Sequence, residues 1–417
     1  MTASRLICFF IFLFTLTMIP SISSGYIAFG LIVVTFGYQM FRGKEKIRID
    51  DLPLFEIFMA YVLWGLISSF FGLEVKRSLH YWKSDLLCGV FWVLYGVFSR
   101  SPKARIWALK GFAVSLLVLA VLGLLQIVMI RWFPSFNDWL VNSPIGWLRK
   151  FSMYPDPHTP RAHGPIHTLT YGEVMAIGGL FWIGSWQHRW GRLCLGALCL
   201  GALVASGSRG PALGFLSGFM VVCFCHFLFA NKFPWRPVLA LAIPALILFS
   251  SDDVWARFKS AFQPNKNRDR ISLWRTGLKV LEDYPLTGVG VAHMKTAWPN
   301  YFQSEWKRYM ASGKEDWSDV HNLYLQQAGE RGLPGLAVLL LLLGALTYRT
   351  YRFMREDSKN RETHIAILGV LVAFLVMNAT ESAFQDTEVV FVFYMLLALG
   401  WSAADRRGAG GAPQWDG

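Results

Sequence analysis

Charged side chains are scarce in this chain: only 16% of its 417 residues are Asp, Glu, Lys or Arg, whereas 54% are hydrophobic. So little charge argues against a water-soluble globular protein of this length, because such a protein needs a polar surface over its core. Apolar runs of roughly 17–25 residues are long enough to cross a bilayer, and such runs recur along the whole chain. The composition therefore predicts an integral membrane protein.

The sequence also lacks the motifs of nucleotide-dependent and metal-dependent enzymes. It contains no P-loop, no dinucleotide-binding glycine fingerprint and no nucleophile elbow. All six cysteines lie in apolar runs, so we expect no disulfide. The spacing of His158, His163 and His167, with prolines between them, matches no zinc pattern. Asp252-Asp253 could bind a divalent ion, but a helix N-cap is the simpler interpretation. We therefore expect no metal and no cofactor.

Twelve apolar runs predict an all-α polytopic membrane protein with about twelve transmembrane helices and two long loops that carry short helices. These runs cover about 6–21, 25–41, 53–72, 85–99, 106–130, 166–186, 193–205, 211–230, 237–250, 332–348, 364–380 and 388–403. The connections that alternate with them on one side are basic, which predicts that this side and both termini are cytoplasmic. Met1–Gly25 could instead be a signal peptide, but a retained first helix fits the charge pattern better.

This topology makes residues 1–417 a single membrane domain. It places an interfacial loop, 131–165, and a larger loop, 251–320, in the periplasm, and it leaves 404–417 as a disordered cytoplasmic tail. The basic inward loops are short and dispersed, so we expect membrane lipids rather than nucleic acid as partners.

The larger loop carries eleven Lys or Arg residues, which favours chemistry on an anionic lipid head group. The spacing predicts a helix over Arg268–Asp283. Its apolar face would hold Ile271, Trp274, Leu278 and Leu281, and its opposite, basic side would hold Arg268, Arg275 and Lys279.

His321 follows two potential N-caps, Ser318 and Asp319, so we expect it in the first turn of the next helix, with Tyr324 on the same face. The positive helix end and nearby arginines would keep its ring neutral, as a general base requires. The alternative is that His321 only makes a hydrogen bond at the interface. His163 and His167 are secondary candidates for the base.

Two further arginines lie beside helix starts on the outward side. Arg209 belongs to the turn Ser206-Gly207-Ser208-Arg209-Gly210-Pro211, and Arg161 lies with His163 in a proline-rich segment. A helix N-terminus and a forked guanidinium both bind phosphate oxygens well. Arg161 and Arg209, together with Arg270 and Arg275, are therefore our candidates for binding a diphosphate.

These motifs resemble the O-antigen ligase family of multi-spanning bacterial membrane proteins, most clearly between Leu200 and Leu343. The turn at Ser206–Gly210 is similar to the family's Ser-Arg-Gly turn. The outer-loop signature is matched by Arg270, Trp274 and Tyr284-Pro285-Leu286-Thr287-Gly288-Val289-Gly290. The histidine-helix motif is matched by His321-Asn322-Leu323-Tyr324-Leu325 with Glu330, Gly332 and Gly335.

The resemblance implies a glycosyltransferase of the bacterial inner membrane with a periplasmic active site. It would join O-antigen polysaccharide from undecaprenyl diphosphate to lipid A–core oligosaccharide, without a metal and with inversion, using His321 as general base. O-antigen polymerases and protein O-oligosaccharyltransferases of the same superfamily are alternatives. A flippase or transporter of lipid-linked glycan is an alternative from another class, although the charge of this chain collects in outer loops rather than at the membrane midplane.

Overall fold

The computed structural model describes residues 3–43, 51–149, 152, 161–186, 189–230, 235–242, 246, 250, 252–260, 263, 267–301 and 319–404. Every regular element in these segments is a helix. The prediction of an all-α polytopic membrane protein is confirmed. The expected tail after residue 404 and residues 302–318 lie outside the described residues.

The helices follow the predicted apolar runs closely. The first half contains α1 (Ala3–Thr17), α2 (Ile22–Arg42), α3 (Phe55–Phe70), α4 (Val75–Trp82), η2 (Lys83–Leu87), α5 (Cys88–Arg100), α6 (Pro102–Trp132), α7 (Pro134–Val141), α8 (Gly146–Arg149), α9 (Thr168–Gly184) and α10 (Trp190–Ser206). The second half contains α11 (Arg209–Ala230), α12 (Trp235–Ala240), α14 (Asp252–Ser260), α15 (Arg268–Asp283), α16 (Met294–Ala297), η4 (Trp298–Asn300), α18 (Leu323–Glu356), α19 (Arg361–Met377), η5 (Ala383–Gln385) and α20 (Thr387–Ala404).

Among the described residues, five helices are long and apolar enough to cross a membrane: α2, α6, α11, α18 and α20. Shorter apolar helices, α1, α3 and α10, accompany them. Large apolar side chains are exposed on the outer faces of several helices, for example Val34 on α2 and Phe224 on α11. A membrane protein turns such side chains toward lipid, so the exposure fits a bilayer environment.

Two helices at the centre, α9 and α20, are buried on all sides. Nearly every residue of α9 from Thr170 onward is buried, and so is nearly every residue of α20 from Val389 onward. A helix that is apolar all round belongs in the interior of a bundle. α9 packs against α10, α19 and α11, and α20 packs against α5 and α9. The two central helices therefore set the positions of the loops at both ends of the bundle.

Helix α18 is kinked at Gly332, the residue at which the predicted apolar run 332–348 begins. The backbone there has φ 69°, and Pro334 follows, so regular hydrogen bonding is interrupted. The loop 284–290 satisfies the freed groups: Val289 N–H donates to the Gly329 carbonyl at 2.9 Å, and Leu333 N–H donates to the Pro285 carbonyl at 2.8 Å. The segment 284–290, which carries the outer-loop signature, thus binds the backbone of α18 on both sides of the kink.

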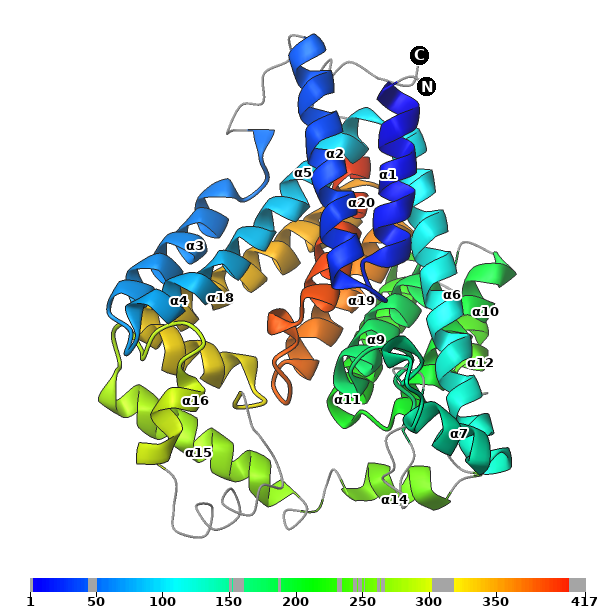
Figure 1. Cartoon of the computed structure of the whole chain (residues 1–417). Coiled ribbons are helices and arrows are strands. Elements are labelled where there is room, and N and C mark those ends of the chain that lie inside the picture. Colours follow the sequence, from blue (N-terminus) through cyan, green and yellow to red (C-terminus); the bar gives the residue numbers. More distant parts are fainter. Residues whose placement is uncertain are drawn as a thin grey trace.

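Short helices cross one end of the bundle. Figure 1 shows α14, α15 and α16 below the membrane helices, whereas α1 begins near the top. The start of α18, the end of α19 and the turn between α10 and α11 face this layer of short helices.

Candidate functional site

Helix α15 is tied to the bundle through two side chains one turn apart. Arg270 Nη2 lies 2.7 Å from Glu381 Oε1, and Arg270 Nη1 donates to the Thr380 carbonyl. Trp274 Nε1 donates to the His321 carbonyl at 3.4 Å. Residues i and i+4 share a helix face. One face of α15 therefore contacts two segments: the connection after α19, through Arg270, and His321 just before α18, through Trp274.

The predicted bounds of this helix, Arg268–Asp283, are confirmed, but its predicted apolar face is only partly right, because Ile271, Trp274 and Leu281 are half-buried rather than buried. The buried positions are Leu273, Thr276, Gly277 and Val280, whereas Leu278 is exposed. A methyl group built on Gly277 would lie 3.4 Å from Val320 and 3.6 Å from Leu325, so this position faces the start of α18. Hydrophobic periodicity does not reveal a contact made at a glycine.

His321 is held between two carboxyl groups. Its Nδ1 lies 3.3 Å from Asp319 Oδ1 and 3.5 Å from Glu381 Oε2, and the His321 side chain is 14% exposed. Its backbone N–H also donates to Asp319 Oδ1 at 2.6 Å. The residue has φ 50°, a left-handed conformation that non-glycine residues seldom adopt. Such strain persists where the surroundings fix a side chain tightly, as at many functional sites.

Two expectations about His321 need correction. The N-cap of α18 is Asn322, whose side chain accepts from Leu325 N–H, so His321 lies outside the helix rather than in its first turn. Its nearest charged groups are also acidic rather than wholly basic, because Asp319 and Glu381 flank the ring. The electrostatic reason given for a neutral ring is therefore wrong.

The connection after α19 organises this arrangement. Leu323 N–H donates to the carbonyls of Asn378 and Glu381, and Asn322 Nδ2 donates to the Ala379 carbonyl at 2.8 Å. Burial alone raises the pKa of the Glu381 carboxyl. The hydrogen bond from His321 and the charge of Arg270 outweigh burial and lower that pKa below its usual value. Glu381 is thus an ionised group that joins His321 to Arg270.

The turn between α10 and α11 lies against the same connection. A side chain at Gly210 would come within 2.5 Å of Thr380 Oγ1 and 2.8 Å of Glu381 Cγ, so only glycine allows this approach. Arg161 Nε donates to the Ser206 carbonyl at 2.8 Å, and Arg161 Nη2 donates to Ser208 Oγ at 3.2 Å. The structure therefore brings Arg161 and the Arg209 turn beside the Glu381 connection.

Arg209 begins α11 and donates from Nη1 to Ser260 Oγ of α14 at 3.2 Å. Its neighbour Gly210 contacts the Glu381 connection. Arg270 lies on that connection too. Three of the four arginines predicted to bind a diphosphate thus surround one connection, although they are separated by up to 109 residues along the chain.

The other predicted residues lie farther out or are engaged elsewhere. Arg275 and Lys279 are exposed on the outer side of α15. Tyr324 donates its hydroxyl to the Leu375 carbonyl at 2.7 Å. His163 Nε2 lies 3.1 Å from the Ser152 carbonyl oxygen, and burial lowers the pKa of its ring. His167 is the exposed N-cap residue of α9, and His158 lies outside the described residues.

Sequence reasoning missed the carboxyl groups. Besides Asp319 and Glu381, the site contains Asp386, which accepts from Thr170 Oγ1 at 2.7 Å and interacts with Glu173 of α9. Burial raises the pKa of Asp386, and the hydrogen bonds from Thr170 and Glu173 oppose this effect. The only signal in the sequence was a connection, 381–387, that has acidic residues but no Lys or Arg.

A polar cavity of about 610 Å³ opens beside the site. Asp319 and Asp386 lie on one side of it, and Arg77 and Lys295 also line it. Its deeper wall includes the buried ion pair between Arg331 and Asp85, whose two N–O contacts are each 2.8 Å. The volume falls within the roughly 300–1,000 Å³ of small-molecule sites, so it can accept a saccharide unit next to Asp319.

Metal ligands do not cluster here. Among the described residues, no group of three or more His, Cys, Asp or Glu side chains is placed to hold a metal ion. Asp252 begins α14, and the side chain of Asp253 lies outside the described residues.

The geometry is that of a multi-pass membrane protein with a histidine, carboxylates and arginines gathered at one end of its bundle. Residues 194–340, about a third of the chain, match the protein family described as O-antigen ligase. This match supports membership of the O-antigen ligase superfamily, and the matched segment contains Arg209, Arg270 and His321. Arg161 and Glu381 lie outside that segment.

The chain is also similar to an uncharacterised protein of Haemophilus influenzae (strain ATCC 51907 / DSM 11121 / KW20 / Rd). The two are 25% identical over 206 residues, which cover 45% of this chain and 50% of that protein. The matched segment thus spans about half the length of this relative.

Proposed function

We propose that this protein transfers a glycan from a polyprenyl diphosphate to a hydroxyl group of an acceptor, and that it does so as an O-antigen ligase. The donor would be O-antigen polysaccharide on undecaprenyl diphosphate, and the acceptor would be lipid A–core oligosaccharide. The active site would face the periplasm in the bacterial inner membrane. The observation that carries this proposal is the placement of His321 between Asp319 and Glu381, where Glu381 also binds Arg270. His321, Asp319 and Arg270 all lie in the segment that matches O-antigen ligases.

His321 would act as the general base. A carboxylate beside Nδ1 favours a proton on that nitrogen, which leaves the lone pair on Nε2 available. The acceptor hydroxyl would give its proton to Nε2 while its oxygen forms a bond to the anomeric carbon. The bond between that carbon and the diphosphate oxygen would break, and the electron pair would leave on the diphosphate. One direct displacement of this kind inverts the anomeric centre.

The arginines would stabilise the departing diphosphate. Arg161 and Arg209 lie at the turn between α10 and α11, and fixed cations are effective where negative charge develops. Arg270 is already bonded to Glu381, so its charge serves first to hold that carboxylate. The exposed side chains of Arg275 and Lys279 would attract the donor to the surface of α15 rather than contact the reacting bond.

The cavity beside Asp319 would receive the acceptor. Its walls offer hydroxyl, amide and charged groups from Tyr81, Gln326, Gln327 and Lys295, which suit the hydroxyl groups of a saccharide. The donor would then approach from the arginine side and the acceptor from the cavity side, so that they meet at His321.

Product analysis tests this function. Purified protein would be mixed in detergent with lipid-linked glycan and lipid A–core, without a membrane gradient and in excess EDTA. We expect a covalent product of glycan and lipid A–core. A product that joins two lipid-linked glycans would instead indicate a polymerase, and no covalent product with active substrates would indicate a flippase. Loss of product restored by added magnesium would contradict metal independence.

A further inference from the structure

Four helices that build the candidate active site meet again at their other ends. A second cavity lies there. It is lined by the end of α9, the start of α10, the start of α19, the end of α20 and the first turns of α6. The cavity measures about 270 Å³. Helix α9 has 17 residues, which corresponds to about 25 Å at 1.5 Å per residue. The second cavity is therefore separate from His321 and lies toward the opposite membrane surface.

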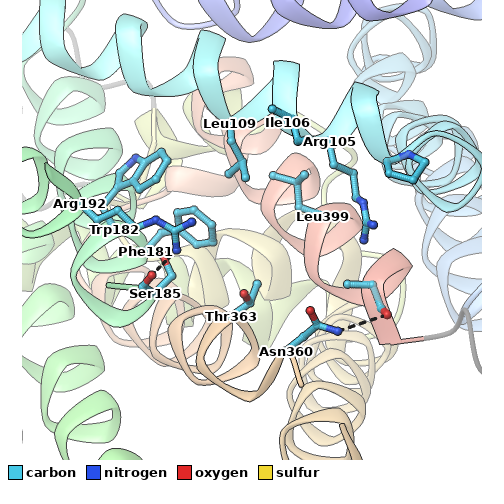
Figure 2. A pocket seen from close by; sticks show the side chains of 12 residues that line it. Arg105, Ile106, Leu109, Phe181, Trp182, Ser185, Arg192, Asn360, Thr363 and Leu399 are labelled. Atoms are coloured by element: carbon cyan, nitrogen blue, oxygen red, sulfur yellow. Dashed lines mark hydrogen bonds between the residues drawn. The ribbon is translucent and has the colours of Figure 1, made fainter. Parts of the chain in front are cut away.

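The lining of this cavity combines two guanidinium groups with apolar and aromatic side chains. Arg105 of α6 and Arg192 of α10 approach from different sides, and Leu109 and Leu399 lie between them (Figure 2). Among the lining residues there is no carboxylate. Two cations around an apolar floor favour an anion that also carries an apolar part.

Two buried polar groups of the lining also lack a hydrogen-bond partner among the described residues. They are the hydroxyl of Ser185, whose residue is 1% exposed, and the indole N–H of Trp182, whose residue is 6% exposed. Leaving such a group unsatisfied costs about 1–3 kcal/mol, so buried groups of this kind normally bind something. Both lie close to Arg192, which donates to the Ser185 carbonyl and sits with Cζ 5.7 Å from the Trp182 ring.

We propose that this cavity binds the phosphate group of an anionic phospholipid. The phosphate oxygens would accept hydrogen bonds from Arg192, Trp182 and Ser185, and Arg105 would add its positive charge from the other side of the cavity. The glycerol and first acyl carbons would lie along Ile106 and Leu109. Forked guanidinium donors match phosphate oxygens closely. This site is independent of the proposed transfer reaction.

The surroundings favour a lipid over a soluble phosphate ester. Ile106 lines the cavity and is 53% exposed, and Trp190 at the start of α10 is 57% exposed. Tryptophan at a helix end is typical of the membrane interface. The volume of the cavity is too small for a whole lipid but suits a head group whose chains continue along the outer surface of α6.

Thermal unfolding of the full-length protein in a non-ionic detergent tests this proposal. The probe is dioleoyl phosphatidylglycerol, compared with dioleoyl phosphatidylcholine and with inorganic phosphate, each titrated over the same range. We expect phosphatidylglycerol to raise the unfolding temperature, and the other two to leave it nearly unchanged. Native mass spectrometry of the same samples should show retained phosphatidylglycerol.

The variants separate binding from folding. Arg105→Gln combined with Arg192→Gln should raise the phosphatidylglycerol concentration for half-maximal effect by about tenfold or more. Because Arg192 also bonds the Ser185 carbonyl, Trp182→Phe and Ser185→Ala provide milder tests that remove one donor each. Without lipid they should unfold at or above the wild-type temperature, yet respond more weakly to phosphatidylglycerol. Lys110→Gln removes a cation of α6 that is not among the lining residues and serves as the control.

Three results would overturn the proposal. The first is an equal response of the wild type and the double arginine variant to phosphatidylglycerol. The second is equal stabilisation by phosphatidylcholine, which would indicate general solvation by lipid. The third is equal stabilisation by inorganic phosphate, which would assign the cavity to a soluble anion.

Discussion

The Glu381 carboxylate connects the two residue types on which the proposed chemistry depends. One oxygen binds Arg270 at 2.7 Å, and the other lies 3.5 Å from His321 Nδ1. Arg270 and His321 could be singled out from the sequence because a cation and a histidine in an outward loop suggest phosphate chemistry. Glu381 could not, since it lies 60 residues beyond His321 and its partners are fixed only by the packing of α15 on the bundle.

The charge of Glu381 should make the stability of the folded protein depend on pH in the acid range. Its pKa is lowered in the folded protein, so the unfolded carboxyl, near 4.5, binds a proton more readily. The stabilisation is therefore present above the unfolded value and is lost as the pH falls through the lower folded value. We expect the unfolding temperature of the wild type to drop more steeply from about pH 5 to about pH 3 than that of Glu381→Gln.

At neutral pH, Glu381→Gln should cost up to about 3 kcal/mol, because it leaves the charge of Arg270 without its partner. The exposed residue Glu282 on the same helix as Arg270 supplies the control variant, Glu282→Gln, which should match the wild type at every pH. Parallel acid profiles for Glu381→Gln and the wild type would mean that the carboxylate is not ionised in the folded protein.

Arg209 and Arg275 should differ sharply in their tolerance of lysine. Arg209 lies at the turn that contacts the Glu381 connection, whereas Arg275 is exposed on α15. Lysine keeps the charge but loses the forked donors. We expect Arg209→Lys to slow glycan transfer by about tenfold to a hundredfold, and Arg275→Lys to have an effect of less than about threefold. Initial rates with purified variants measure both, and the opposite order would move the diphosphate to the outer side of α15.

At the scale of the elements, some features depend on local chemistry and could be read from the sequence. The bounds Arg268–Asp283 follow from local periodicity, and the kink of α18 follows from Gly332 and Pro334. The predicted start of α18 and part of the predicted apolar face of α15 were wrong, because both depend on tertiary partners. The buried residue Gly277 faces Val320 and Leu325, and Asn322 becomes the N-cap while it also donates to the Ala379 carbonyl.

The kink provides a matched pair of glycine variants in one helix. Gly332 has φ 69°, and a side chain there would meet the Leu286 carbonyl oxygen. Gly344 is helical and has open space around it. We expect Gly332→Ala to destabilise the protein by about 1–3 kcal/mol or more, and Gly344→Ala to leave it unchanged or to stabilise it by about 0.5–1 kcal/mol. Thermal unfolding in detergent compares the two variants. Equal stabilities would show that close packing of loop 284–290 against Gly332 does not stabilise the kink.

At the scale of the whole molecule, eleven of the twelve predicted apolar runs correspond to helices, and the run 237–250 is described only at 237–242, 246 and 250. Membrane crossing imposes long apolar segments, so their number and order could be predicted from composition. Which helices lie at the centre could not be predicted from apolarity, because the central helix α20 has a lower mean hydropathy than the more exposed helices α6 and α11. The burial of α9 and α20 follows from tertiary packing alone.

Orientation is testable with single cysteines after the six native cysteines are replaced. Glu282 is exposed at the end of α15, and Ser358 is exposed in the connection between α18 and α19. If the end that carries α15 faces the periplasm, Glu282→Cys should react with a membrane-impermeant thiol reagent in intact spheroplasts. Ser358→Cys should react only after lysis. The reverse pattern would invert the protein in the membrane.

The rate of transfer by His321→Ala, measured together with its donor binding, tests the central claim most directly. Purified wild type and variant would be compared in single-turnover reactions with saturating lipid-linked glycan and lipid A–core, and donor affinity would be measured separately. A general base contributes about 10²–10⁴ in rate, so the variant should bind donor almost normally and transfer at least about a hundredfold more slowly. Weak donor binding with an unchanged chemical step, or no loss in either, would contradict the account.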